Sequence, residues 1–248
     1  MPTPHKVPDV MASIRNCLPR AMLVSLAVCA AWTPVAKASE ESVDQATQAA
    51  LSLDAHPKRG AASYTKYCAQ CHGAQAHGDA ARTIPALAGQ RFAYLVRQLA
   101  NFSGGERDSS AMHKVVSQQV LQKPQTWVDL AAYLNNAPLI GAAQYGDGKH
   151  LSLGEGIFHE QCASCHSHDA RGDADGFVPS LRSQHYPYLV AQIHGLAAGR
   201  RHNVDENLMR FFKSLEDGDI SAVADYLSRL QGPGSDRKKM RNDGVVVD

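Results

Sequence analysis

The apolar positions of this chain recur at helical spacing, and no stretch alternates polar and apolar residues as a strand would. In "RFAYLVRQLANF" and "YPYLVAQIHGL" the large apolar side chains share one face of a helix. Pro124 suits a first helical turn, and Asp217 and Asp219 favour a second helix start. The helices expected from these patterns cover residues 58–70, 91–102, 124–136, 153–164, 186–196 and 218–230. The expected fold class is therefore all-α.

The helical pattern occurs twice, because the chain contains an internal repeat. Residues 68–107 align with residues 162–201 without a gap. The identical pairs include Cys68/Cys162, Cys71/Cys165, His72/His166, Pro85/Pro179, Gln90/Gln184, Tyr94/Tyr188, Gln98/Gln192 and Arg107/Arg201. We therefore expect two tandem domains at residues 57–137 and 151–230, joined by a linker at 138–150.

The two ends of the chain lie outside this repeat. Arg15 and Arg20 precede an apolar run from Ala21 to Trp32, and small residues follow at Ala36-Lys37-Ala38. This order is typical of a secretory signal peptide, and the run is short for a segment that crosses a bilayer. We expect a signal peptide at 1–38 cleaved after Ala38, an N-terminal extension at 39–56 and a charged, disordered tail at 231–248. The expected location is the periplasm.

The charge balance excludes one class of function. The whole chain has 25 basic and 24 acidic residues, and loss of residues 1–38 leaves 21 basic and 23 acidic ones. A slightly acidic chain is not expected to bind nucleic acid, because proteins that do so carry a basic surface.

All cysteines that remain after cleavage lie in two C-x-x-C-H motifs, at 68–72 and 162–166. Zinc is one alternative, but paired zinc motifs usually lie about 15–20 residues apart, and zinc does not explain the adjacent histidine. A thioredoxin-type dithiol is another, but no βαβ pattern surrounds either motif. In c-type haem attachment both thiols bond to the porphyrin and the adjacent histidine binds the iron. The motifs predict two covalently attached haems, held by Cys68, Cys71, Cys162 and Cys165, with His72 and His166 as axial ligands.

The second axial ligand decides whether a haem carries electrons or binds a substrate. Met112 lies 41 residues after Cys71, and Met209 lies 44 residues after Cys165. A thioether suits haem iron and raises its potential, so we predict that these two methionines, in otherwise polar loops, complete the axial pairs. His113, His194 and His202 are the alternative ligands, although none has an equivalent in the other repeat. Six further histidines, at positions 56, 77, 150, 159, 168 and 185, are predicted to be solvated.

These features together resemble the cytochrome c4 family of two-domain, two-haem proteins. The resemblance is carried by "CAQCHGAQAHGD", by "IPALAGQRFAYLVRQLANFSGGER" followed by Met112, and by "LAAYLNN", and it covers residues 57–230. It implies two tandem class I cytochrome c domains, each wrapped around one covalently attached haem.

The resemblance also implies two local contacts. Gly60 and Gly154 would let the first helix of each domain approach the last one closely. The carbonyl groups of Pro85 and Pro179 would accept a hydrogen bond from the proximal imidazoles and so orient these rings.

The second domain departs from the family pattern. Arg182 and Ser183 stand where the first domain has Ala-Gly, and the segment leading to Met209 is three residues longer and more charged. We expect these changes to affect the potential of the second haem, its partner surface or its sixth ligand. A docking role for Arg200 and Arg201 is one such hypothesis, because surface charge steers redox partners together.

The expected function is that of an electron carrier rather than an enzyme, because two fully ligated irons leave no open position for a substrate. The expected partners are a quinol-oxidising complex and a terminal oxidase or reductase, or a flavoprotein dehydrogenase, and any membrane association would come through them. Two alternatives stay open. One is a haem subunit of a larger dehydrogenase, such as a flavocytochrome sulfide dehydrogenase. The other is a di-haem enzyme with one open haem, such as a peroxidase or a thiosulfate-oxidising cytochrome.

Overall fold

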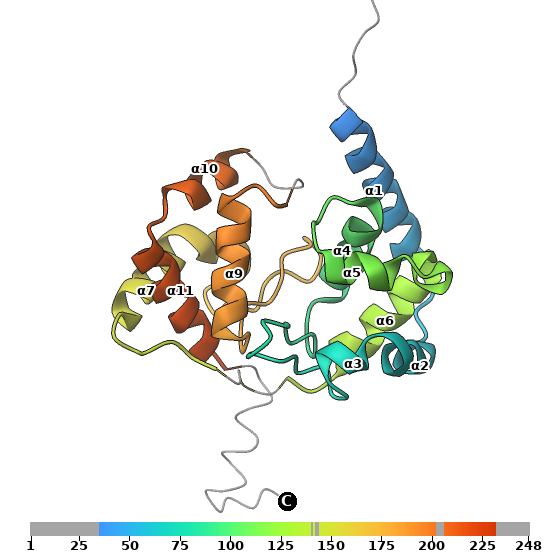
Figure 1. Cartoon of the computed structure of the whole chain (residues 1–248), viewed down its shortest axis with the longest axis horizontal. Coiled ribbons are helices and arrows are strands. Elements are labelled where there is room, and N and C mark those ends of the chain that lie inside the picture. The colour runs from blue at the N-terminus through green and yellow to red at the C-terminus, as the bar shows by residue number, and fades with distance from the viewer. Residues whose placement is uncertain (1–34, 140, 142–143, 202–205, 232–248) are drawn as a thin grey trace, which may run out of the picture. The chain divides into compact units, whose positions relative to one another are not determined.

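The structure is a computed structural model that describes residues 35–139, 141, 144–201 and 206–231. Figure 1 shows these residues as helices joined by loops. The first part of the chain contains α1 (Val35–Leu51), α2 (Pro57–Tyr67), α3 (Ala69–His72), α4 (Phe92–Gly104), α5 (Ser110–Val116), the 3₁₀ helix η1 (Gln119–Gln122) and α6 (Pro124–Asn136). The second part contains α7 (Leu151–Ile157), the π-helical turn η2 (Phe158–Cys162), α8 (Ala163–His166), α9 (Tyr186–Ala197), α10 (Glu206–Ser214) and α11 (Asp217–Arg229).

The described residues contain no strand, only two isolated β-bridges, which pair Asp79 with Ile84 and Arg107 with Arg201. The prediction of an all-α fold is confirmed for these residues. In the same part of the chain, no helix combines the length and the apolar character that crossing a membrane requires.

Each domain is closed by a contact between its first and last repeated helices. In the first domain α2 packs on α6, and in the second α7 packs on α11. A Cβ atom on Gly60 would lie 1.9 Å from the carbonyl oxygen of Asp129, and one on Gly154 would lie 2.1 Å from that of Ala222. No side chain fits at such a distance, so glycine is required where these helices cross. The expected close approach at Gly60 and Gly154 is confirmed.

The two cores occupy equivalent places in the repeat. Tyr64 in α2 and Phe158 in η2 are matched positions, and both are fully buried. Around Tyr64 lie the buried residues Val96 of α4 and Val128 of α6, while Leu189 of α9 and Val223 of α11 belong to the core around Phe158. The same helices thus bury the same faces in both domains.

Helix α1 was not indicated by the sequence patterns. Its residues Val43, Thr47 and Ala50 are buried, and the helix packs against α4 and α6. The N-terminal extension at 39–56 therefore contributes to the core of the first domain. Most of the expected signal peptide (residues 1–34) and nearly all of the expected disordered tail (residues 232–248) lie outside the described residues.

Candidate haem sites

Each C-x-x-C-H motif lies at the end of a helix, where a single short turn presents the thiols and the imidazole. Helix α2 ends at Tyr67, and the four-residue helix α3 carries Cys71 and His72. The second motif has the same form, because α8 carries Cys165 and His166. Cys71 and Cys165 are exposed, and Cys68 and Cys162 are half-buried.

The raised pKa values of the half-buried thiols, Cys68 and Cys162, argue against redox-active dithiols. Burial, together with the neighbouring thiol, raises the pKa of Cys68 to about 12 and the pKa of Cys162 to about 11. A thioredoxin-type pair needs a thiol whose pKa is lowered, not raised. The two cysteine pairs also do not come together, since no group of three or more His, Cys, Asp or Glu residues in the described ranges is arranged to hold a metal ion.

Each motif histidine makes the contact that an oriented metal ligand needs. The Nδ1 atom of His72 lies 3.1 Å from the carbonyl oxygen of Pro85, and the Nδ1 atom of His166 lies 3.1 Å from that of Pro179. A carbonyl oxygen only accepts, so Nδ1 carries the proton and Nε2 keeps its lone pair. Burial lowers the pKa of both histidines, against a smaller raising effect of this hydrogen bond. Each ring is thus held neutral with Nε2 available to a metal.

The chain returns to each histidine through a loop that glycine makes possible. Gly78 donates from its N–H to the carbonyl of His72 at 2.9 Å, and Gly172 donates to that of His166 at 2.8 Å. Both glycines have a positive φ, and a Cβ on Gly78 would lie 2.4 Å from the carbonyl oxygen of Ile84. Only glycine therefore fits here, and the loop brings Pro85 back over the imidazole.

The loop substitutions in the second domain keep its backbone path. Ser183 has φ of 54°, close to the 68° of Gly89. Its N–H donates to Leu230 at 2.8 Å, as the N–H of Gly89 donates to Leu134 at 2.8 Å. Arg182 forms an ion pair with Asp169 at the edge of the same loop. The departure from the family pattern therefore changes the surface charge without changing the fold around Pro179.

The expected sixth ligands lie on short helices, not in the polar loops where the sequence analysis placed them. Met112 is half-buried in α5, and its N–H is 3.3 Å from Oγ of Ser109, which caps the helix. Met209 is half-buried in α10. His113 and His194 are also half-buried, and His202 lies outside the described residues. Helix α5 packs on α4, and α10 packs on α9, so the two methionines come from corresponding elements.

Helix α10 suggests that a large apolar group belongs beside it. The helix contains Leu208, Met209, Phe211 and Phe212, yet none of its residues is buried by protein. A strongly amphipathic helix normally buries its apolar face. The porphyrin of a haem is an apolar surface of the required kind.

A cluster of buried and half-buried polar side chains lies between the two domains. We call the residues Tyr94, Gln98, Arg107, Tyr188, Gln192 and Arg201 the interdomain cluster. Arg107 is buried, and its guanidinium donates to Gln98 at 2.7 Å, to Tyr188 at 2.8 Å and to Gln192 at 2.8 Å. These three partners are neutral side chains, and within the described residues no ion pair of Arg107 with a carboxylate is found.

Buried polar atoms near this cluster also indicate that a hydrogen-bonding group belongs beside it. The buried Nδ2 and Oδ1 atoms of Asn101 and the Nε atom of Arg201 find no hydrogen-bond partner within the part of the chain that the structure describes. Burial raises the pKa of Tyr94, but the guanidinium groups of Arg107 and Arg201 lower it more, so the net shift is downward. A haem carries two propionate carboxylates, and these are acceptors and counter-anions of the kind that Arg107 and Arg201 would bind. The residues present therefore fit a haem in each domain.

Apart from the docking hypothesis for Arg201, the sequence analysis assigned no role to the residues of the interdomain cluster. Gln98 and Arg107 are identical to Gln192 and Arg201 in the repeat, and this identity of polar residues was the available signal. One interpretation was wrong. His185 is buried with 2% of its surface exposed, not solvated, and its Nε2 atom lies 2.7 Å from the carbonyl oxygen of His77. Arg201 is half-buried and lies 3.4 Å from Oε1 of Gln98, whereas Arg200 is exposed, and the docking role of the two stays a prediction.

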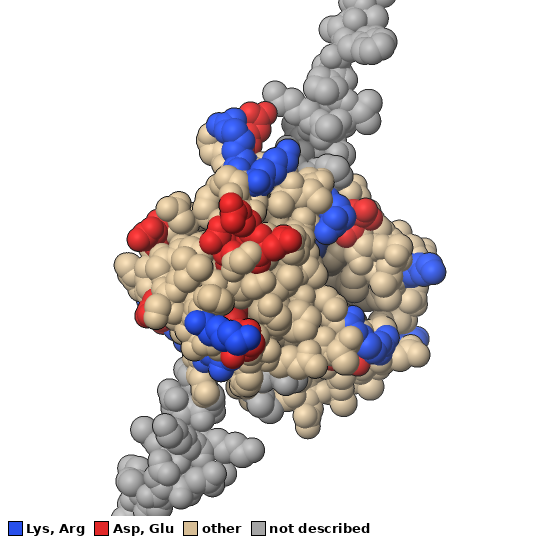
Figure 2. All heavy atoms as spheres, turned by 60° about the vertical axis from the view of Figure 1, so that its left-hand side comes forward, with Lys and Arg blue, Asp and Glu red and all other residues tan. Residues whose placement is uncertain are grey.

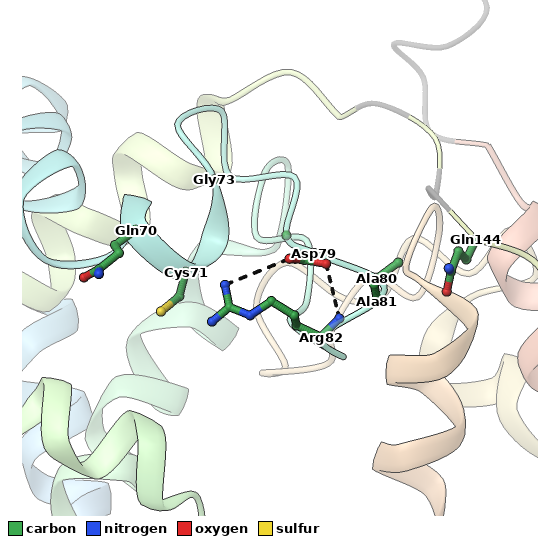
Figure 3. Close-up of a pocket in the computed structure, with 9 residues that line it drawn as sticks. Gln70, Cys71, Gly73, Asp79, Ala80, Ala81, Arg82 and Gln144 are labelled. Atoms are coloured by element: carbon green, nitrogen blue, oxygen red, sulfur yellow. Dashed lines mark hydrogen bonds and ion pairs between the residues drawn. The ribbon is translucent and has the colours of Figure 1, made fainter.

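The surface beside the first motif is hollowed. Cys71 lines a cleft of about 500 Å³ together with Gln70, Asp79, Arg82 and Gln144. Figure 3 shows these side chains and the contact of Asp79 with Arg82, whose N–H is 3.2 Å from the carboxylate. On the face drawn in Figure 2, basic side chains lie among acidic ones and do not form a separate basic field.

Comparison with known proteins matches each half of the chain to a family of cytochrome proteins. The family described as "Cytochrome c" matches residues 151–231, and the family described as "Cytochrome C oxidase, cbb3-type, subunit III" matches residues 55–134. Cytochrome c4 of Stutzerimonas stutzeri is 30% identical over 179 residues, which cover 66% of this chain and 84% of that protein. The "Thiosulfate dehydrogenase electron acceptor" of Stutzerimonas stutzeri (strain A1501) is 28% identical over 207 residues, covering 79% and 94%. The crystal structure of reduced recombinant cytochrome c4 from Pseudomonas stutzeri matches 72% of this chain and 100% of its own, with a TM-score of 0.63 and 26% identity.

Proposed function

Because this chain belongs to the cytochrome c4 family, we propose that it carries electrons between periplasmic redox proteins, with each haem iron bound by a histidine and a methionine. It has two cytochrome c domains and two covalently attached c-type haems, and it is a di-haem electron carrier of the cytochrome c4 type. Each haem supplies a one-electron iron couple.

The proposed attachment residues and ligands form two matched sets. Cys68, Cys71, His72 and Met112 hold the first haem within residues 57–137, and Cys162, Cys165, His166 and Met209 hold the second within residues 151–230. The observation that carries the proposal is the 3.1 Å contact between Nδ1 and a proline carbonyl, which is the same in both domains. Two imidazoles oriented alike, each with a methionine on the corresponding helix, are what two saturated, electron-transferring irons require.

An absorption spectrum of the purified oxidised protein, extended to the near-infrared band of sulfur-to-iron coordination, tests this ligation. We expect a band equivalent to two haems and no spectral change on adding carbon monoxide to the reduced protein. Met112→Ala and Met209→Ala should each remove half of the band, while Met240→Ala should leave it intact. A band for one haem only, with carbon monoxide binding at the other, would instead favour a di-haem enzyme.

The similarity to two proteins called thiosulfate dehydrogenase electron acceptors favours one class of partner. We propose that a dehydrogenase of the thiosulfate-oxidising kind is a donor to this protein, alongside a quinol-oxidising complex. Rapid-mixing reduction kinetics with each donor at several salt concentrations would rank the two. Reduction by thiosulfate alone, without a dehydrogenase, would mean that the protein is itself the enzyme.

Export to the periplasm is supported by the segment 1–38. Cleavage after Ala38 would shorten α1 but keep its buried residues Val43, Thr47 and Ala50. N-terminal sequencing of the mature protein should therefore begin at Ser39, whereas retention of residues before Ala38 would contradict the proposed cleavage.

A further inference from the structure

Two glutamines exchange hydrogen bonds between the domains in a reciprocal manner. Gln184 of the second domain donates from Nε2 to the carbonyl of Ala86 at 3.0 Å, and its Oε1 accepts from the N–H of Ala86 at 3.0 Å. Gln90 of the first domain donates to the carbonyl of Ser180 at 2.9 Å, and its Oε1 accepts from the N–H of Ser180 at 2.8 Å. Ala86 and Ser180 are matched positions in the repeat, so the two contacts are equivalent.

The N–H groups that donate to these glutamines belong to peptide groups that also contact the motif histidines. The carbonyl of Pro85 and the N–H of Ala86 belong to one peptide group. Its oxygen accepts from Nδ1 of His72, and its N–H donates to Gln184. The peptide between Pro179 and Ser180 joins His166 to Gln90 in the same way. Each motif histidine is therefore one peptide group away from a side chain of the opposite domain.

Both glutamines are held in place. Gln90 and Gln184 are buried, with 8% and 7% of their surfaces exposed, so water competes little for their amides. The Oε1 of Gln90 also accepts from the N–H of Arg91 at 2.8 Å, and the Oε1 of Gln184 accepts from that of His185 at 3.0 Å. Each amide oxygen is thus fixed at the N–H group of the peptide that contacts the histidine.

Hydrogen bonds connected through one peptide group polarise each other. A donor bond from the Ala86 N–H to Gln184 leaves more negative charge on the Pro85 oxygen. This oxygen then accepts more strongly from Nδ1 of His72, and the imidazole becomes a better donor at Nε2. A stronger imidazole donor stabilises the oxidised iron and lowers its reduction potential.

From this geometry we propose that each haem potential is set in part by the opposite domain, with Gln184 as a positioning residue for His72 and Gln90 for His166. The inference rests on the proposed ligation of the two irons by these histidines. It predicts crossed effects: a change at residue 184, in the second domain, acts on the first haem, and a change at residue 90 acts on the second.

The test is a redox titration of the holoprotein in which NMR signals of the haem methyl groups assign each transition to its haem. Gln184→Leu should raise the potential of the first haem, shifting its oxidised-to-reduced ratio about threefold at fixed ambient potential, or roughly 30 mV for one electron. Gln184→Glu keeps the acceptor and strengthens it, so it should lower the same potential. The Nδ1 proton resonance of His72 should move upfield in Gln184→Leu and downfield in Gln184→Glu.

Gln125→Leu is the control, because it removes a glutamine amide that contacts Asp54 and Asp129 and touches neither proline peptide. It should leave the Nδ1 resonances of His72 and His166 in place. Three results would overturn the inference. Gln184→Leu could change the potential of the second haem instead of the first, Gln184→Leu and Gln184→Glu could change the potential of the first haem in the same direction, or neither could change it. Loss of the near-infrared sulfur band in the parent protein would instead overturn the proposed ligation.

Discussion

Gly154 and Gly156 lie two positions apart in α7 and differ in what surrounds them. A Cβ on Gly154 would lie 2.1 Å from the carbonyl oxygen of Ala222 in α11, whereas one on Gly156 would meet nothing within 4 Å. The first glycine is therefore needed for the crossing of two helices. The second only costs the helix conformational entropy.

Gly154→Ala should destabilise the second domain by about 2–4 kcal/mol, because the clash forces α7 away from α11. Gly156→Ala should be neutral or stabilise by about 0.5–1 kcal/mol, because alanine is the better helix former. Urea unfolding of the two holoproteins, followed by far-ultraviolet circular dichroism, measures both. Equal effects of the two substitutions would mean that α7 and α11 do not cross as closely as described.

Asp129 joins α6 to the start of α2. Its buried carboxylate accepts from the N–H of His56 at 2.8 Å, from Nε of Arg59 at 2.7 Å and from Nε2 of Gln125 at 3.0 Å. Burial alone would raise the pKa of Asp129, but the donors from Arg59, His56 and Gln125 outweigh it and hold the pKa below its usual value. The ionised form is thus favoured by folding, and protonation weakens the link between the two helices.

A carboxyl group whose pKa is depressed by folding contributes stability above its unfolded pKa, near 3.9, and this contribution is lost as the pH falls through the folded pKa. Asp129→Asn should therefore lower the free energy of unfolding at pH 7 by about 1–3 kcal/mol. It should also flatten the decline of stability below about pH 4. Urea midpoints measured from pH 7 down to pH 2 check both effects. Asp54→Asn, at an exposed neighbouring position, is the control and should follow the parent protein.

The helices that could be predicted from the sequence are those with a long apolar face. The segments found as α4, α6, α9 and α11 were expected within a few residues of their observed bounds. Helices α5 and α10 were missed because they are short, and because no residue of α10 is buried. Helix α1 was missed because its buried residues Val43, Thr47 and Ala50 are small, so its apolar stripe is weak.

The parts of the haem sites that could be predicted from the sequence are those in which the chemistry requires particular residues at a fixed spacing along the chain. The residue types and spacing of the motifs at 68–72 and 162–166 are enough to predict haem attachment, because that chemistry requires two thiols and a histidine at fixed spacing. Gln90, Gln184 and Arg107 carry no such local signal. Their roles depend on the surface that each meets in the opposite domain, and matched polar residues in a repeat do not reveal their partners.

The interdomain cluster holds the two halves of the chain together through Arg107. Besides Gln98 in its own domain, this side chain contacts Tyr188 and Gln192 of the second domain. Arg91 makes a different kind of interdomain contact, since its exposed side chain donates to the carbonyl of Arg171 at 2.6 Å. The contributions of a buried and an exposed arginine contact to the stability of one interface can therefore be compared directly.

Arg107→Leu should cost about 2–4 kcal/mol, because buried Gln98 and half-buried Tyr188 and Gln192 would lose their donor. Arg91→Leu should cost at most about 1 kcal/mol, because its contact is exposed to water. Calorimetry of the holoproteins should resolve two separate transitions for Arg107→Leu, one for each domain, and a single transition for Arg91→Leu. A single transition for both would indicate that the domains are coupled by contacts outside the cluster.

The reciprocal bonds of Gln90 and Gln184 pair each position with its counterpart in both directions, which is the rule of an isologous interface in a symmetric homodimer. A homodimer built on this surface would place the glutamine of each subunit against the proline peptide of the other. Within one chain the two copies do not have to be identical, and Arg182 and Ser183 differ from Ala88 and Gly89 of the first domain. A fused pair of domains can therefore give its two haems different surroundings while it keeps the reciprocal contacts of a symmetric dimer.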